Sequence, residues 1–162
     1  MDLPETPPLE GELPVAVMLQ RRPSSHPWRV DSWRITGVVV KHQFSTPERR
    51  LVRSDPDGTE DYLWGGFQLR LYKDEAESYY FNLLAEQPSL YVLTRSGPRH
   101  APEPFLVTAC FDEAHAYMEG EEDAHPVPMP PELHGWIEAF VLTHYVPEQR
   151  RKRKRESWKH ER

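Results

Sequence analysis

The sequence predicts an α+β fold, a single domain in which two or three helices pack on a mostly antiparallel sheet of about six strands. Apolar and polar residues alternate over residues 67–72, which is the two-residue period of a strand with one buried face. Two later stretches repeat apolar residues every three or four positions, as amphipathic helices do. These stripes comprise Ala76, Tyr79, Tyr80, Leu83 and Leu84, and then Leu133, Trp136, Ile137, Phe140, Val141, His144 and Tyr145. Because the connections are short, we expect antiparallel pairing.

The first sixty residues predict an antiparallel hairpin followed by a polar loop. Apolar residues alternate from Leu13 to Gln20, a turn cluster follows at 23–27, and a second strand extends over 28–40. Charged residues fall on both faces of the second strand, so a bulge is expected near Asp31 and Ser32. Residues 41–60 are interpreted as a surface loop, either wholly irregular or with one short strand at 50–53.

The segment 62–95 predicts a strand, a helix and a second strand, and we expect the rest of the domain to pack around it. The helix follows Asp74, and Pro88 ends it because proline lacks the backbone N–H that a helix needs. Gly65 and Gly66 interrupt the first strand. They indicate a bulge or a tight bend, since glycine has no side chain to pack.

The last third of the chain predicts a strand, a short helix, an edge segment and a longer helix. The strand covers 104–111, and Asp112 is expected to cap a helix at 113–119. The prolines in 124–129 favour an edge position, because proline cannot donate to a neighbouring strand. Pro147 ends the last helix.

The composition predicts that the chain divides into three segments and that the protein is located in a reducing compartment. Residues 1–12 are expected to be a disordered N-terminal segment, 13–147 the α+β domain and 148–162 a basic flexible tail. The single cysteine, Cys110, rules out an internal disulfide. No apolar run approaches the roughly 20 residues of a membrane span, and the acidic, proline-rich start does not resemble a signal peptide. The predicted location is the cytoplasm, with no transmembrane segment.

Charge is divided unevenly along the chain. The whole sequence has 20 Lys/Arg and 26 Asp/Glu, yet residues 150–162 alone hold eight Lys/Arg and two Glu. The remainder is therefore strongly acidic. Because phosphate binding needs clustered positive charge, we do not expect nucleic-acid binding over a broad face of the body.

No motif predicts catalysis, a cofactor or a metal site. Asp112, His115 and Glu119 share a helical face, and other histidines, namely His125, His134 and His144, lie in the same half of the chain, but the HExxH and CxxC spacings of zinc sites are absent. Cys110 lies in an apolar strand beside acidic residues, which favours a buried, unreactive thiol. A protein without catalytic activity is favoured, and an enzyme or a metal-binding protein remains the alternative.

Two groups of residues favour the binding of a partner. Arg21, Arg22, Trp28 and Trp33, together with Trp64, have the aromatic and guanidinium composition of interface hot spots. The alternative is that the rings belong to the core and the arginine stems lie along it.

The second group is the basic run in the tail. Its dense positive charge is suited to an acidic protein, to nucleic acid or to anionic lipid, and the alternative is a solubilising extension. The run consists of Arg150, Arg151, Lys152, Arg153, Lys154 and Arg155.

Beyond these patterns, the chain resembles an uncharacterised proteobacterial family that is known by a domain-of-unknown-function label. The resemblance extends over about residues 13–155 and is distributed rather than concentrated in one motif. The matching segments are 13–17, 21–23, Trp28, Trp33, 37–38, 77–79, 82–83, 87–92, 107–109, 127–130, Trp136, Phe140, His144 and 152–155.

This resemblance implies a role rather than an activity. Members are typically encoded near genes for molybdenum-dependent formate dehydrogenase and for molybdenum cofactor. That neighbourhood implies a non-catalytic accessory or adaptor protein that helps the enzyme mature, with the molybdoenzyme or its assembly factors as partners. It assigns no role to any single residue.

Overall fold

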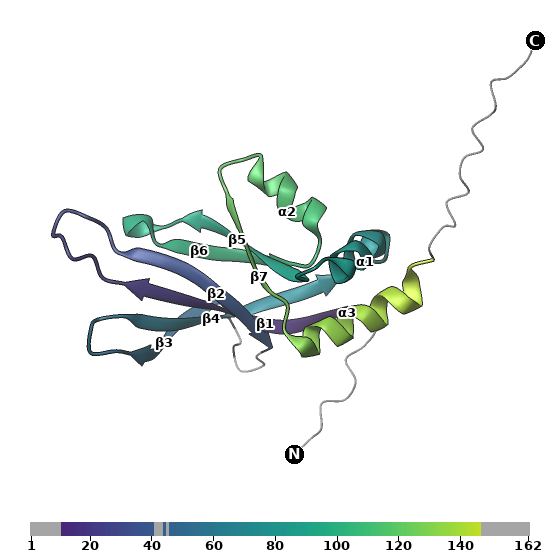
Figure 1. Ribbon diagram of the computed structural model, residues 1–162, viewed down its shortest axis with the longest axis horizontal. Helices are drawn as coiled ribbons and strands as arrows, with labels where there is room; N and C mark the ends of the chain where they lie inside the picture. The colour runs from purple at the N-terminus through teal and green to yellow at the C-terminus, as the bar shows by residue number, and fades with distance from the viewer. Residues whose placement is uncertain (1–10, 41–43, 45, 147–162) are drawn as a thin grey trace, which may run out of the picture.

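The computed structural model describes residues 11–40, 44 and 46–146, and within them it confirms the α+β class (Figure 1). The elements in chain order are β1 (Gly11–Arg22), β2 (Ser32–Val40), β3 (Glu48–Ser54), β4 (Glu60–Leu71), η1 (Lys73–Glu75), α1 (Ala76–Leu84), β5 (Ser89–Ser96), η2 (Pro98–His100), β6 (Pro102–Thr108), α2 (Phe111–Met118), β7 (Asp123–Pro128) and α3 (Pro131–His144). No helix in this part of the chain is long and apolar enough to cross a membrane.

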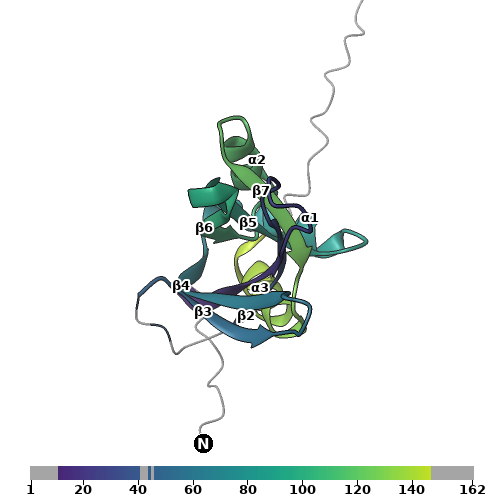
Figure 2. The same ribbon diagram turned by 90° about the vertical axis from the view of Figure 1, so that its left-hand side faces the viewer.

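All the strand pairings are antiparallel, but the strands divide between two sheets. The first sheet has the order β2-β1-β4-β3, and the second has the order β6-β5-β7. Figure 2 shows the second sheet above the first. β4 and β5, which flank α1, therefore belong to different sheets. The expected hairpin of β1 and β2 is confirmed, as is the edge position of the proline-containing β7.

The glycine bulge in β4 is confirmed. Val15 of β1 pairs with Phe67 and Val17 pairs with Trp64, so Gly65 and Gly66 together face a single residue. Gly66 has a φ of 92°, and a Cβ there would collide with the backbone at Pro47. A side chain is therefore excluded both by conformation and by space.

The bulge in the hairpin is not at Asp31 and Ser32, where it was expected. The register shifts further along, at Thr36, where the hydroxyl donates to the carbonyl of Met18 at 3.1 Å. The expectation was wrong because β2 begins only at Ser32. Two of the charged residues that suggested a bulge, Arg29 and Asp31, belong instead to the preceding loop, whereas the third, Arg34, lies in β2.

One hydrophobic core lies between the two sheets and is completed by α1 and α3. The predicted stripe of α3 is confirmed, with Leu133, Trp136, Ile137, Phe140 and Val141 buried. In α1 the fully buried Tyr79 contacts Phe140 edge-on, with 5.9 Å between ring centroids. Its hydroxyl accepts a hydrogen bond from the backbone N–H of Tyr72 at 2.9 Å.

Helix α1 is rotated relative to the predicted stripe. Leu84 is 63% exposed, whereas the polar Asn82 is buried. The Asn82 amide group donates to the carbonyls of Ser89 and Ala109 at 2.7 and 2.9 Å, and its oxygen accepts from the Ser89 N–H at 3.0 Å. This side chain therefore joins α1 to the start of β5 and to the segment between β6 and α2.

Cys110, rather than Asp112, caps α2. Its Sγ accepts from the N–H of Glu113 and lies 3.4 Å from the hydroxyl of Ser78. Burial raises the pKa of the thiol, in agreement with the prediction of a buried, unreactive cysteine.

We predict that Asn82→Ala lowers the free energy of unfolding by about 2–4 kcal/mol. It removes three hydrogen bonds worth about 1 kcal/mol each and leaves buried backbone groups unpaired. Chemical denaturation measures the loss. The exposed Glu86→Ala is the control and should stay within about 0.5 kcal/mol of the wild type. An equally small effect at Asn82 would contradict the proposed role.

A pH dependence follows from His125. Its Nε2 lies 2.9 Å from the hydroxyl of Thr94, and burial lowers the pKa of the imidazole. Because the folded state binds the proton less readily than the unfolded state, stability should be complete above about pH 6.5 and should fall as the pH decreases below it. Thermal unfolding of His125→Gln between pH 7 and pH 5 should show a weaker decline than the wild type. Parallel declines would rule out this histidine as the cause.

Candidate functional site

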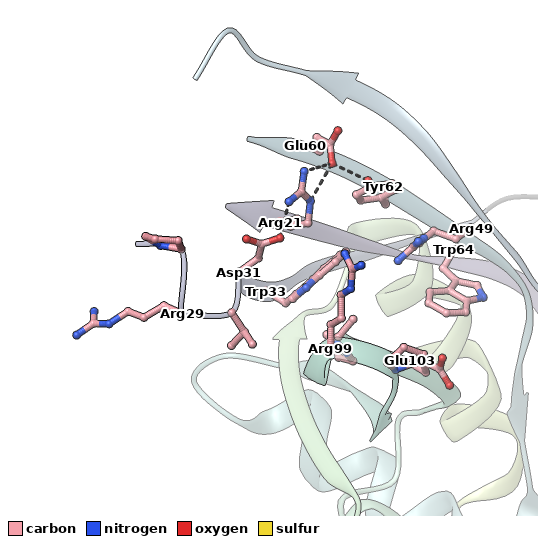
Figure 3. A pocket seen from close by; sticks show the side chains of 15 residues that line it. Arg21, Arg29, Asp31, Trp33, Arg49, Glu60, Tyr62, Trp64, Arg99 and Glu103 are labelled. Atoms are coloured by element: carbon pink, nitrogen blue, oxygen red, sulfur yellow. Dashed lines mark hydrogen bonds and ion pairs between the residues drawn. The ribbon is translucent and has the colours of Figure 1, made fainter. Parts of the chain in front are cut away.

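A cleft of about 970 Å³ lies between one end of the first sheet and the η2 turn (Figure 3). We call it the arginine–aromatic cleft. Its lining comes from all four strands of the first sheet, from the loop before β2 and from the residues around η2. The charged and aromatic residues in it are Arg21, Arg29, Asp31, Trp33, Arg49, Glu60, Tyr62, Trp64, Arg99 and Glu103.

The position of the cleft follows from the alternation along β1. Val17 and Leu19 are buried in the core, and Arg21 is the next residue on the same face. Arg21 lies between Trp33 of β2 and Glu60 of β4 in the strand pairing. The face that forms the apolar core therefore ends in a row of polar and aromatic side chains.

Arg21 holds two carboxylates in place. Its Nε and Nη2 donate to Glu60 Oε1 at 2.8 and 2.5 Å, and its Nη1 donates to Asp31 Oδ2 at 2.5 Å. The Tyr62 hydroxyl donates to the same Glu60 oxygen at 2.7 Å, and the Ser24 N–H donates to Asp31 at 3.0 Å. Figure 3 marks the bonds of Arg21 with both acids and of Glu60 with Tyr62.

These hydrogen bonds change the pKa values of Glu60, Asp31 and Tyr62. The Tyr62 hydroxyl and then Arg21 lower the pKa of Glu60, while the Ser24 N–H and then Arg21 lower the pKa of Asp31. Burial, followed by the bond to Glu60, raises the pKa of Tyr62. At neutral pH the cluster therefore contains one guanidinium and two carboxylates, so its net charge is negative and it offers no net positive charge to a ligand.

Arg49 lies over a cage of three aromatic rings. Its guanidinium carbon is 4.8 Å from the ring centre of Tyr62, 5.6 Å from that of Trp33 and 5.8 Å from that of Trp64. Arg49 stands opposite Trp64 in the pairing of β3 with β4, which brings the cation over the rings. Cation–π contacts at exposed sites contribute about 0.5–1 kcal/mol. The contacts of Arg49 with the rings are therefore weak enough for a group of a bound partner to replace them.

The η2 turn supplies the opposite wall. Arg99 and His100 have φ angles of 58° and 62°, a left-handed conformation that non-glycine residues rarely adopt. The turn is closed by the Gly97 N–H, which donates to the Ala101 carbonyl at 2.7 Å. Two consecutive residues in this region cost free energy, and such conformations concentrate at binding sites.

The cleft combines flat aromatic surface with guanidinium groups that are available to a ligand. Within the described chain neither Arg29 nor Arg99 forms an ion pair, and both are exposed. Trp, Tyr and Arg dominate the binding energy of protein interfaces. The arrangement is therefore suited to a protein segment with carboxylate and apolar groups.

The predicted binding residues separate in the structure. Arg21 and Trp33, with Trp64, come together in the cleft. Trp28 is 80% exposed and stacks on His26 in the loop before β2, next to the cleft rather than in it. Arg22 is exposed and does not line the cleft. The predicted tail residues, Arg150 to Arg155, lie outside the described residues.

Sequence reasoning missed several cleft residues, chiefly Arg49, Tyr62, Glu60 and Arg99. The sequence does indicate that some of these cleft residues lie together: Glu60, Tyr62 and Trp64 are spaced two positions apart and so share one face of a strand. No comparable local pattern connects Arg49 or Arg99 to that face.

The histidines considered for metal binding are dispersed. His115 stacks on Phe111, His125 bonds Thr94, and His144 packs against the ring of Phe140. Among the described residues, no group of three or more His, Cys, Asp or Glu side chains is arranged to hold a metal ion.

We predict that Arg21→Met raises the pKa values of Asp31 and Glu60, because the cation that stabilises their charged forms is lost. Both carboxylates contribute to stability above their unfolded pKa values near 4, so the variant should be less stable at pH 7 and less sensitive to acid. The loss should be smaller than that of Asn82→Ala. NMR titration of the carboxyl carbons and denaturation at pH 7 and pH 3 test this. Arg22→Met is the matched control. If both variants had the same carboxyl pKa values and the same stability, Arg21 would not be what holds the two carboxylates in their charged form.

Comparison with known proteins places the chain in a family without assigning an activity. The family model described as "Protein of unknown function (DUF3305)" matches residues 14–154, a span that includes nearly all of the described fold. No curated protein and no solved structure gives a significant match. The match confirms the expected membership in a family of unknown function. With most of its length matched by that model, the chain belongs to the DUF3305 family.

Proposed function

We propose that the protein is a non-catalytic cytoplasmic accessory protein that binds another protein through the arginine–aromatic cleft. One observation supports the binding role above all: Arg49 lies over three aromatic rings in a cleft that the exposed Arg29 and Arg99 also line. This is the composition of an interface hot spot on a surface with a concave shape.

The cleft is also prepared for binding before a partner arrives. Arg21 fixes Asp31 of the loop before β2 and Glu60 of β4. Trp33 and Tyr62 contact each other at 5.7 Å between ring centroids. Side chains that are already ordered lose little entropy on binding, so more of the contact energy appears as affinity.

The partner proposed is a molybdenum-dependent formate dehydrogenase or one of its assembly factors, and the role is assistance in maturation. This part of the proposal rests on the gene neighbourhood that the family resemblance implies. The charge of Arg29 and Arg99 favours a segment of the partner that carries carboxylates, because complementary charge speeds encounter and fixes orientation.

Deletion of the gene tests the role in maturation. Formate dehydrogenase activity should fall while unrelated enzymes keep theirs, and the intact gene should restore it. Normal formate dehydrogenase activity in the deletion strain would contradict the proposal.

Variants in the cleft connect that role to the site. Arg29→Glu combined with Arg99→Asn removes two exposed guanidinium groups that form no ion pair within the described residues, and asparagine tolerates the left-handed conformation at position 99. We expect the double variant to fold normally, to restore little activity and to bind formate dehydrogenase subunits at least about tenfold more weakly in a pull-down titration. Arg22→Glu, which changes an exposed arginine outside the cleft, should behave as the wild type.

A further inference from the structure

We infer that β3 is a second docking surface, at which an extended acidic segment of a partner protein adds a fifth strand to the first sheet. The inference is independent of the proposed function, because it rests on a sheet edge rather than on the cleft.

β3 forms an edge that no other described strand covers. It is the last strand in the order β2-β1-β4-β3, and in the described chain it pairs with β4 alone (Figure 1). All seven of its residues are exposed, including Leu51 at 52% and Val52 at 59%. The other outer strand of this sheet, β2, lies instead against β7 of the second sheet. Among the described elements, β3 is therefore the outer strand of the first sheet without a comparable contact to the second sheet.

An edge strand presents main-chain hydrogen-bonding groups to any strand that can pair with it. In an antiparallel ladder alternate residues direct N–H and C=O away from the existing neighbour. Over seven residues β3 offers about 24 Å of edge, at roughly 3.4 Å per residue. Peptides recognised by strand addition use such an edge, with alternate side chains setting specificity.

The side chains of β3 define the charge of the segment that fits. Besides Arg49, which lies over the rings of the cleft, the strand carries Arg50 and Arg53 against a single acid, Glu48, on a chain whose acidic residues outnumber the basic ones by 26 to 20. Arg50 pairs with Glu48 at 2.6 Å and Arg53 pairs with Asp55 at 3.0 Å; both arginines and Glu48 are exposed, and Asp55 is partly exposed. Exposed pairs of this kind contribute about 0–1 kcal/mol, so an incoming carboxylate can replace them.

The same features exclude a second copy of the chain as the occupant. Antiparallel pairing of two β3 strands would place arginines near arginines, and like charges on facing strands are destabilising. A bulge at Val52, where Leu51 pairs with Tyr62 and Arg53 pairs with Asp61, further disturbs pairing with an identical edge. Charged residues and bulges are the means by which edge strands avoid self-association. An extended segment with acidic side chains is therefore the strand whose charge best complements β3.

The experiment uses a fluorescein-labelled eight-residue peptide in which glutamate alternates with valine, titrated with the full chain in fluorescence anisotropy. We expect binding that weakens with added salt. It should weaken at least tenfold for Arg50→Glu with Arg53→Glu and for a peptide with lysine in place of glutamate. It should be lost when alternate peptide amides are N-methylated, because methylation removes ladder donors and keeps every charge.

Three results would overturn the inference. The N-methylated peptide could bind equally well, the glutamate peptide could fail to bind at millimolar concentration, or sedimentation could show dimers that dissociate in the charge-reversed variant. Circular dichroism checks the fold of that variant, and Arg50→Gln with Arg53→Gln replaces it if it is unfolded. The cleft variant Arg29→Glu with Arg99→Asn should bind the peptide within twofold of the wild type, so a failure at the edge is distinguishable from a failure of the cleft.

Discussion

Burial of one face of β1 is the constraint on which the rest of the structure depends. β1 pairs with β2 on one side and β4 on the other, and Val15 and Val17 on its inner face have no exposed surface. A strand paired on both sides needs a second layer over its apolar face. The second sheet and α3 supply that layer, and the cleft is where the apolar face gives way to Arg21. Core and candidate site are thus successive parts of one strand face.

Local periodicity was enough to predict the fold class but not the arrangement of the sheets. The stripe of α3 was predicted correctly because every apolar position on it reached the core. The division into two sheets was not predicted, because alternation along a strand does not specify its neighbours. In α1, hydrophobicity favoured Leu84 as a buried residue, whereas three hydrogen bonds place Asn82 there instead. A buried amide that replaces an apolar residue leaves no periodic signal in one sequence.

The candidate site was predictable by composition and not by geometry. Tryptophan and arginine near the first hairpin indicated a binding surface, and Arg21 and Trp33 do line the cleft. Arg49 joins them only through the register of β3 against β4, and Arg99 only through the packing of the second sheet over the first. Trp28 is the opposite case, since its residue type suggested the site while its loop places it beside the cleft.

The central claim is that the arginine–aromatic cleft is the surface that contacts a partner protein, and hydrogen–deuterium exchange measures it most directly. The full chain is compared alone and with purified molybdenum-dependent formate dehydrogenase. We expect slower amide exchange in residues 97–102 and in 23–31, the two segments that contribute loop residues to the cleft, with α1 and α3 unchanged. Protection confined to the helices, or no protection in a complex that demonstrably forms, would contradict it.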